Sequence, residues 1–368
     1  LNTGSSSIKF AAYRPAGSEP GEPVLRGQVS GLPGMPKLSA QAPEAGIADR
    51  FLAAADISDI SPERIAPRLL AAIEAALGGN VSALGHRIVQ GGPDISDSRT
   101  ATPGLLDYLE TLAPLAPDHQ PHNLAGVRAI LAGRPDLRQT LSFDTAFHRS
   151  QPRIAQLYAI PRRLSDEGII RYGYHGLSYA HLARRMADIF PGRAPRRILA
   201  LHLGSGASLC GILDGRSIAC SMGFSAISGI PMSTRCGDLD PGALLYLISE
   251  HGLGAGEISE MLRKESGLFG VSGISGDLRQ LEASTDPAAA EAIDLFVYRI
   301  VREAGSLIAA LGGLDGVIFT GGIGENSVRV RQGVIEGLAW AGVGAAAGIA
   351  VVQADEEAEI ARGCLNAA

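Results

Sequence analysis

Two arginines and a histidine lie in glycine-rich or polar segments, where charged side chains can meet a ligand. Arg87 belongs to GHRIVQGG, Arg235 to MSTRCGDLDPG and His175 to RYGYHGLSYAHL. A guanidinium stays charged and binds carboxylate or phosphate through parallel hydrogen bonds. Each arginine taken alone also fits a solvated surface side chain. Together, the two arginines indicate an anionic substrate or a charged transition state.

An aspartate at the end of an apolar run is a further candidate. Asp144 closes the segment QTLSFDTA, which has the pattern of a buried strand. A carboxylate in that place is costly unless it is paired or faces a cleft. We therefore interpret Asp144 as functional, and we expect His119 and His148 to be structural.

Three small-residue turns are typical of phosphate-binding segments. The first ten residues, LNTGSSSIKF, are echoed from Leu201 by LHLGSGASLC, which aligns Asn2 with His202. Such turns present backbone N–H groups and hydroxyls to anions. A third segment, GGIGEN at 321–326, follows an apolar strand and opens a helix, whose N-terminus favours negative charge. Each of the first two turns alone also fits a surface hairpin, and the third fits a strand-to-helix turn without a ligand. The echo between the first two indicates two halves that face one phosphate-bearing ligand.

The elements that must position these groups alternate between strands and helices. Apolar periodicity and end signals predict helices at 61–77, 123–131, 175–190, 240–251, 256–266 and 287–311. Strands are predicted at 81–89, 139–146, 198–202, 207–213, 217–222, 316–320 and 349–353, with short strands and loops over 15–49. Since the order recurs in the second half, we expect an α/β chain with a duplicated mixed sheet flanked by helices. Ligands bind such sheets at the carboxyl ends of strands.

Composition excludes several classes of function. The chain has 368 residues and a formal net charge of −6, without a basic block that would bind nucleic acid. No apolar run reaches the ~18 residues of a membrane span. The 4 cysteines lack metal-ligand spacing, which predicts free thiols in a reducing cytoplasm. Because the sequence starts inside a strand pattern and without methionine, we expect further residues before Leu1.

A set of motifs, in order along nearly the whole chain, closely resembles the acetate kinase family, which includes propionate and butyrate kinases. The motifs are NTGSSSIKF, GHRIVQGG, SFDTAFH, RYGYHGLS, LHLGSGAS, SMGFSAISGIPMSTRCGDLDP, SGISGDLR and FTGGIGENS. The family belongs to the superfamily of sugar kinases, heat-shock ATPases and actin. The resemblance implies two ribonuclease H-like domains around an ATP cleft. Residues 1–147, with the C-terminal helix 358–368, would form the acyl-kinase domain, and residues 148–357 the nucleotide-binding domain.

The resemblance also implies an activity. The enzyme would reversibly transfer the γ-phosphoryl group of ATP to acetate, propionate or another short-chain fatty acid, giving an acyl phosphate and ADP. It would use Mg²⁺ and act as a cytoplasmic homodimer. A carboxylate is already a nucleophile at neutral pH, so the transfer mainly requires positioning and charge neutralisation. Asp144 is then interpreted as an orienting and metal-shell group rather than as a proton acceptor.

Site residues follow from the resemblance position by position. The catalytic residues would be Arg87, Asp144, His175 and Arg235. The acyl group would contact Arg87, Val89, Tyr174 and Ala226. ATP would contact Lys9, His202, Leu203, Gly204, Ser205, Gly206, Asp277, Leu278, Arg279, Gly321, Gly322, Ile323, Gly324 and Glu325. Asn2 and Glu356 would help to place Mg²⁺.

Several residues depart from the family pattern. Tyr179 replaces a second histidine, and Tyr174 replaces a phenylalanine. Ala226 stands where the family has a pocket proline, and Asp118 precedes His119 in place of an apolar residue. The changes at Tyr174, Ala226 and Asp118 fall where the family builds its acyl pocket. A lost proline ring enlarges that pocket, which favours propionate or a larger acid and relaxed specificity.

Two alternatives within the superfamily stay open on sequence grounds. A nucleotide-dependent conformational ATPase needs no carboxylate clamp, so the two arginines speak against it. A sugar kinase needs a pocket that reads hydroxyls, whereas Val89, Ile227 and Ile230 are apolar. The long helix at 287–311 is the segment that we expect to host a dimer interface.

Overall fold

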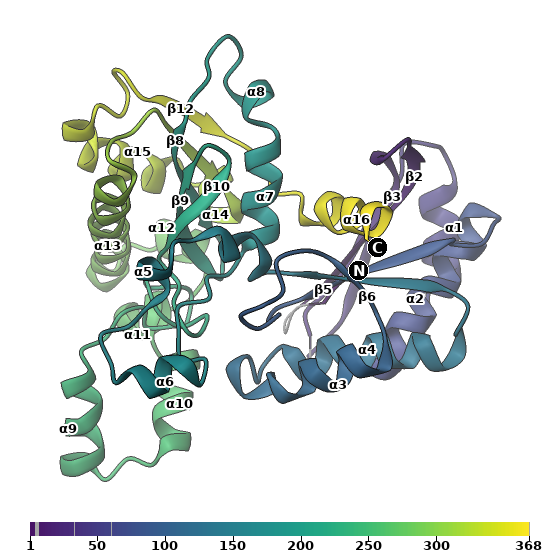
Figure 1. Ribbon diagram of the computed structural model, residues 1–368, viewed down its shortest axis with the longest axis horizontal. Coiled ribbons are helices and arrows are strands. Elements are labelled where there is room, and N and C mark those ends of the chain that lie inside the picture. Colours follow the sequence, from purple (N-terminus) through teal and green to yellow (C-terminus); the bar gives the residue numbers. More distant parts are fainter. Residues whose placement is uncertain (4–6, 33, 60, 368) are drawn as a thin grey trace. The chain divides into compact units, whose positions relative to one another are not determined.

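The computed structural model describes residues 1–3, 7–32, 34–59 and 61–367. The chain forms two compact units (Figure 1). The first unit comprises Leu1–Arg149, Gly176–His181 and Asp355–Ala368, and the second comprises Ser150–His175 and Leu182–Ala354. Among the described residues, no helix combines the length and apolar character needed to cross a bilayer. The mixed α/β fold class predicted from the sequence is confirmed.

The first unit contains two sheets. One is antiparallel in the order β1-β2-β3-β4: Asn2–Thr3, Ser7–Ala16, Glu19–Ser30 and Lys37–Gln41. The other has the order β5-β7-β6: Ala83–Ile88, Arg138–Phe143 and Arg99–Thr100, with β5 parallel to β7. Strand β3 is 12 residues long, so the prediction of only short strands over 15–49 is wrong. Leu1 joins the two sheets, because its backbone bonds to Gly85 and Arg87 of β5.

Helices cover these sheets and close the core of the first unit. They are α1 (Ile47–Ala54), α2 (Pro62–Leu77), α3 (Pro103–Thr111), η1 (Ala113–Leu115), α4 (Gln120–Gly133), η2 (Ala146–Ser150) and α16 (Glu356–Asn366). Helix α2 begins after Ser61 and ends at the left-handed Gly78, as its end signals predict. Phe10, Leu25 and Phe51 are buried in the core that α1 and α2 form with β2 and β3.

The second unit is built on one mixed sheet in the order β10-β9-β8-β11-β12. These strands are Arg216–Cys220, Ala207–Leu213, Arg197–Leu203, Gly316–Thr320 and Gly348–Val351. Its helices are α5 (Arg153–Gln156), α6 (Arg162–Asp166), α8 (Met186–Ile189), α9 (Pro241–His251), α10 (Ala255–Lys264), α11 (Gly267–Ser272), α12 (Leu278–Ala283), α13 (Pro287–Leu311), α14 (Gly321–Asn326), α15 (Val328–Gly337) and η3 (Ala339–Ala341). Helix α7 (Gly176–Arg184) ends before α8, so the single helix predicted over 175–190 is divided at Arg185.

The echo between the two turns is visible in the strand pairing. Asn2 pairs with Lys9 across β1 and β2, and His202 pairs with Ser208 across β8 and β9. Both segments are therefore antiparallel hairpins. Gly4 and Ser5, the expected counterparts of Gly204 and Ser205, lie outside the described residues.

Helix α16 rests on β5 at a glycine. A Cβ atom at Gly85 would lie 2.6 Å from Cγ2 of Ile360 and 3.0 Å from its carbonyl oxygen. We expect Gly85→Val to lower the free energy of unfolding by about 1–3 kcal/mol, because α16 must shift to admit the side chain. Urea unfolding measures this change. In the control Gly104→Ala, the new Cβ meets nothing within 4 Å, so an equal loss in both variants would contradict the packing argument.

Candidate active site

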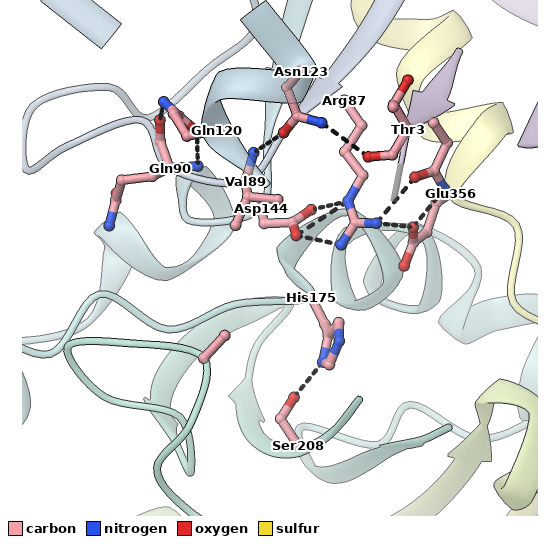
Figure 2. Close-up of polar contacts among 12 residues, drawn as sticks. Thr3, Arg87, Val89, Gln90, Gln120, Asn123, Asp144, His175, Ser208 and Glu356 are labelled. Carbon is pink, nitrogen blue, oxygen red and sulfur yellow. Dashed lines mark hydrogen bonds and ion pairs between the residues drawn. The ribbon is translucent and has the colours of Figure 1, made fainter. Parts of the chain in front are cut away.

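An ion pair between Arg87 and Asp144 forms the centre of the site in the first unit. Arg87 lies near the end of β5 and Asp144 follows β7, so the parallel pairing of these strands brings both side chains to one sheet edge. Nε donates to Oδ1 at 2.9 Å, and Nη2 donates to Oδ2 at 2.6 Å (Figure 2). The Asp144 side chain is 1% exposed and that of Arg87 is 16% exposed. This is a buried, two-pronged contact of the kind that fixes geometry.

Asn2 and Glu356 complete this cluster. Arg87 Nη1 donates to Oδ1 of Asn2 at 3.0 Å, and Asn2 Nδ2 donates to Glu356 Oε2 and to Glu357 Oε1, both at 2.9 Å. Glu356 is buried, and its carboxylate lies 3.8 Å from Nη1 of Arg87. It begins α16, where a carboxylate is favoured by the helix dipole, so this helix starts earlier than the predicted residue 358.

Burial and charge act in opposite directions on this pair. Burial raises the pKa of Asp144, and the Arg87 guanidinium opposes that rise. Burial lowers the pKa of Arg87, whereas the charges of Asp144 and Glu356 raise it. The net shift of the Arg87 pKa is upward. Arg87 therefore stays charged, with the carboxyl groups of Asp144 and Glu356 both close to its guanidinium.

Buried amides hold the loop that follows β5, and sequence reasoning missed them. Gln120 Nε2 donates to the carbonyl of Gln90 at 2.9 Å, while Gln90 N donates back to Gln120 Oε1 at 3.1 Å. Asn123 accepts from the Val89 amide through Oδ1 at 3.3 Å. Both amides lie on α4, which begins at Gln120 rather than at the predicted residue 123 (Figure 2). Their only sequence signal was two amides on a helix, one turn apart.

In the second unit, His175 and Arg235 converge on the turn between β8 and β9. A Cβ atom at Gly206 would lie 3.3 Å from His175 Nε2 and 3.7 Å from Arg235 Nη1. His175 stacks on His202 with ring centroids 4.2 Å apart, and its Nδ1 is 2.9 Å from Ser208 Oγ. The backbone of His175 is left-handed, with φ of 58°, where it caps α7.

The glycine turns of the second unit also come together. The turn at Gly204 lies against the start of α14, since a Cβ atom at Gly204 would be 3.9 Å from the Gly322 amide. Gly321 has φ of 79°, and a side chain there would meet the Leu203 carbonyl at 2.7 Å. The turn predicted at 321–326 is itself the short helix α14. Glu325 Oε1 accepts from the amides of Gly321 and Ala354, at 3.0 and 2.9 Å, so its carboxylate braces the turn.

The remaining predicted residues are distributed over both units. Tyr174 donates to the Phe224 carbonyl at 2.8 Å, and the Ala226 carbonyl accepts from Arg235 at 3.0 Å. Asp277 caps α12 and pairs with exposed Arg279 at 2.6 Å, while Leu278 is buried. Ser205 accepts from the Ser233 amide through its carbonyl, and Ile323 lies within α14. Lys9, by contrast, belongs to the first unit, where it is exposed on β2 opposite Asn2.

Ser208 orients the His175 ring. Its side chain is buried on β9, and the contact to Nδ1 directs Nε2 toward Gly206. We expect Ser208→Ala to lower kcat of the catalysed reaction about tenfold, the cost of losing one buried hydrogen bond, while Ser208→Thr retains most of it. Steady-state kinetics measures both. Equal kcat values in the alanine variant and the parent would contradict an orienting role for Ser208.

Comparison with known proteins identifies the family. The model of the acetokinase family matches residues 1–361. The chain belongs to the acetokinase family. This membership confirms the resemblance drawn from the motifs and the predicted enzyme class, an ATP-dependent kinase of carboxylates. The comparisons favour neither the conformational ATPase nor the sugar kinase.

Relatives of this acetokinase-family chain match it over most of their length. It is 46% identical to an acetate kinase of Methylocella silvestris over 93% of this chain and 86% of the relative. It is 43% identical to an acetate kinase of Rhizobium meliloti, with the same coverage. Among solved structures, an acetate kinase of Porphyromonas gingivalis has a TM-score of 0.80 at 33% identity, covering 99% of this chain and 98% of that one. A propionate kinase of Francisella tularensis has a TM-score of 0.83 at 30% identity, covering 100% and 98%.

Proposed function

We propose that this member of the acetokinase family transfers the γ-phosphoryl group of ATP to acetate or propionate, reversibly, to give an acyl phosphate and ADP. The family match over residues 1–361 carries this proposal. The geometry supports it, because each unit holds charged groups suited to one partner of the reaction. Groups suited to binding a carboxylate lie around Arg87. Groups suited to binding phosphate lie around the glycine turns at Gly206 and Gly321.

Arg87 attracts and orients the acid in this mechanism. Its contacts to Asp144 and Asn2 use part of its five N–H donors, so donor capacity remains for a carboxylate. Asp144 holds the guanidinium in one orientation and does not act as a base, because an ionised acid is already a nucleophile. Positioning of this kind supplies much of the rate in phosphoryl transfer.

His175 and Arg235 neutralise the charge of the phosphoryl group as it moves. Both side chains approach the Gly206 turn, and His175 is oriented by Ser208. ATP lies along the segments that contain Gly204, Asp277 and Gly322, where glycines let the backbone approach the nucleotide closely. Donors aimed at developing charge are commonly the largest single contribution to catalysis.

Mg²⁺ fits the oxygen donors of the first unit. This ion is usually held by one or two carboxylates together with substrate phosphates and water. Glu356 and Glu357 accept from the Asn2 amide, and Asp144 is a further buried carboxylate, bonded to Arg87. No preformed group of three metal-binding side chains occurs among the described residues. Bound with ATP, the ion would neutralise phosphate charge, and Glu356 and Asn2 would orient it.

The pocket residues favour an acid larger than acetate. Ala226 replaces a ring with a methyl group, and its carbonyl is held by Arg235 at 3.0 Å. One methylene in an apolar pocket changes the selectivity by about 1–3 kcal/mol. We therefore propose that acetate and propionate are both substrates, with propionate at least as good as acetate.

A hydroxamate assay tests the proposed function. Purified protein, ATP and Mg²⁺ are incubated with acetate, propionate or butyrate, and acyl phosphate is trapped with hydroxylamine. The expected result is hydroxamate from at least one acid, and no ATP consumption when glucose replaces the acid. Absence of acyl phosphate with every acid would overturn the proposal. The ratio of kcat/KM values for propionate and acetate then decides the preference.

Assembly and compartment belong to the same proposal. We place the protein in a reducing cytoplasm, which suits the free thiols of Cys210, Cys220, Cys236 and Cys364. A homodimer is supported by exposed apolar side chains, including Tyr298 on α13 and Trp340 on η3. Sedimentation equilibrium of the full chain measures the mass of the particle.

A further inference from the structure

The backbone of Leu1, just before β1, pairs with strand β5. The Leu1 nitrogen donates to the Gly85 carbonyl at 2.7 Å, and the Arg87 amide donates to the Leu1 carbonyl at 2.9 Å. Bonds of a parallel ladder are evenly spaced, two residues apart on each strand. In this pattern, the Thr3 amide would donate to the Arg87 carbonyl, and the Val89 amide would then donate to the Thr3 carbonyl.

The side-chain amide of Asn123 occupies the place of that bond. Asn123 Oδ1 accepts from the Val89 amide at 3.3 Å, and Asn123 Nδ2 donates to the Thr3 carbonyl at 2.8 Å (Figure 2). The amide thus stands in for one peptide group between the two strands, with an acceptor toward one strand and a donor toward the other. Both backbone groups stay satisfied while the strand ends are held apart.

The residues next to the two ends of this amide bridge are those that the proposed function uses. Asn2 precedes Thr3, and Arg87 lies two positions before Val89. Asn2 Oδ1 and Arg87 Nη1 are 3.0 Å apart, so the spacing of the two strand ends sets this contact. Asn123 is only 4% exposed and projects from α4, a helix of 14 residues whose buried face includes Leu124, Val127 and Ile130.

We propose that Asn123 is a positioning residue for phosphoryl transfer. Its amide sets the separation of the ends of β1 and β5, and thereby the placement of Asn2 and Arg87 relative to the acid and the metal-bound phosphate. This inference rests on the proposed function. It adds that turnover of the acid depends on a residue of α4 that acts through Asn2 and Arg87.

Asn123→Asp is the informative variant, because it preserves the shape of the side chain and removes the donor to Thr3. An ionised carboxylate would also face the Thr3 carbonyl, which repels it. We expect kcat/KM for the acid to fall about 10–100-fold, as for outer-shell partners of metal sites. The affinity for ADP, measured by calorimetry without acid, should stay within about twofold, since the proposed nucleotide segments belong to the second unit. Hydrogen exchange of the amides in 87–92 should accelerate.

Gln139→Ala is the matched control. Gln139 is 2% exposed in the same unit, and its Oε1 is 2.8 Å from His86 Nε2. His86 and Arg87 are successive residues of β5, so their side chains leave the strand on opposite faces. This variant loses a buried amide and some thermal stability, but should keep the parental kcat/KM. If Asn123→Asp also keeps it, or loses ADP affinity in equal measure, the positioning role is wrong while the proposed function stands. If the parent forms no acyl phosphate, the proposed function fails, and unchanged exchange in 87–92 would overturn the spacing role separately.

Discussion

Replacing Arg87 with methionine is expected to cost the first unit about 3–5 kcal/mol of unfolding free energy, because it leaves the buried Asp144 carboxylate without its partner. The same variant should lower kcat/KM for the acid about 10²–10³-fold, the usual cost of one donor aimed at reacting charge. Arg87→Lys keeps a positive charge but not the fork that meets both carboxylate oxygens and Asn2. We therefore expect lysine to restore stability better than activity.

A double variant separates the two losses. In Arg87→Met/Asp144→Leu, no unpaired carboxylate remains at position 144, so most of the unfolding free energy should return. Activity should not return, because the guanidinium is still missing. Chemical denaturation and the hydroxamate assay measure the two quantities on the same preparations. Recovery of activity in the double variant would show that Arg87 acts only by neutralising Asp144.

Loss of Arg235 should produce the largest kinetic effect. Its Nη1 approaches the Gly206 turn together with His175 Nε2. We expect Arg235→Ala to reduce kcat about 10³-fold or more, the range found for arginines that stabilise a phosphoryl group in transfer. KM values should change little, because that charge develops mainly in the transition state. Arg235→Lys should recover only a small part of kcat, since lysine cannot supply two parallel N–H groups.

The control for this prediction is an exposed arginine of the same unit. Arg196 pairs with Asp214 at 2.6 Å, and both side chains are largely exposed. Arg196→Ala should leave kcat and both KM values unchanged. Pre-steady-state measurement of the phosphoryl step, rather than of product release, gives the sharpest comparison. A kcat that stays within tenfold of the parent in Arg235→Ala would exclude a role in the transition state.

Sequence reasoning succeeded where local signals decide the structure. Helix α13 has the predicted limits, because Asp286 caps its start, Pro287 occupies its first position and left-handed Gly312 ends it. The hairpin of β8 and β9 was likewise visible in alternation and turn residues. Arg87 was recognised as an anion-binding side chain and Asp144, separately, as a costly carboxylate at a strand end. The parallel pairing of β5 with β7 brings them together.

Sequence reasoning failed where the partner is distant in the chain. Asn123 bonds to Thr3 across 120 positions. Its amide finds both of its partners only because β1 and β5 are adjacent in the fold. The start of α16 was placed too late, since no apolar periodicity marks Glu356 and Glu357 as helical. The segment 321–326 was predicted as a turn that leads into a helix, and its own folding into α14 was missed, because glycines are poor helix formers. There Glu325 accepts from the first amide of the turn and stabilises it.

The distribution of the first unit along the chain sets an order on its assembly during synthesis. Asn2 and Glu356 are 354 positions apart, and most of the second unit is translated between them. At ~5–20 residues per second, the nascent chain carries Asn2, Arg87 and Asp144 for tens of seconds before Glu356 is added. Until α16 leaves the ribosome, β5 lacks the helix that packs at Gly85. The cluster around Arg87 is thus among the last parts of the first unit to be completed.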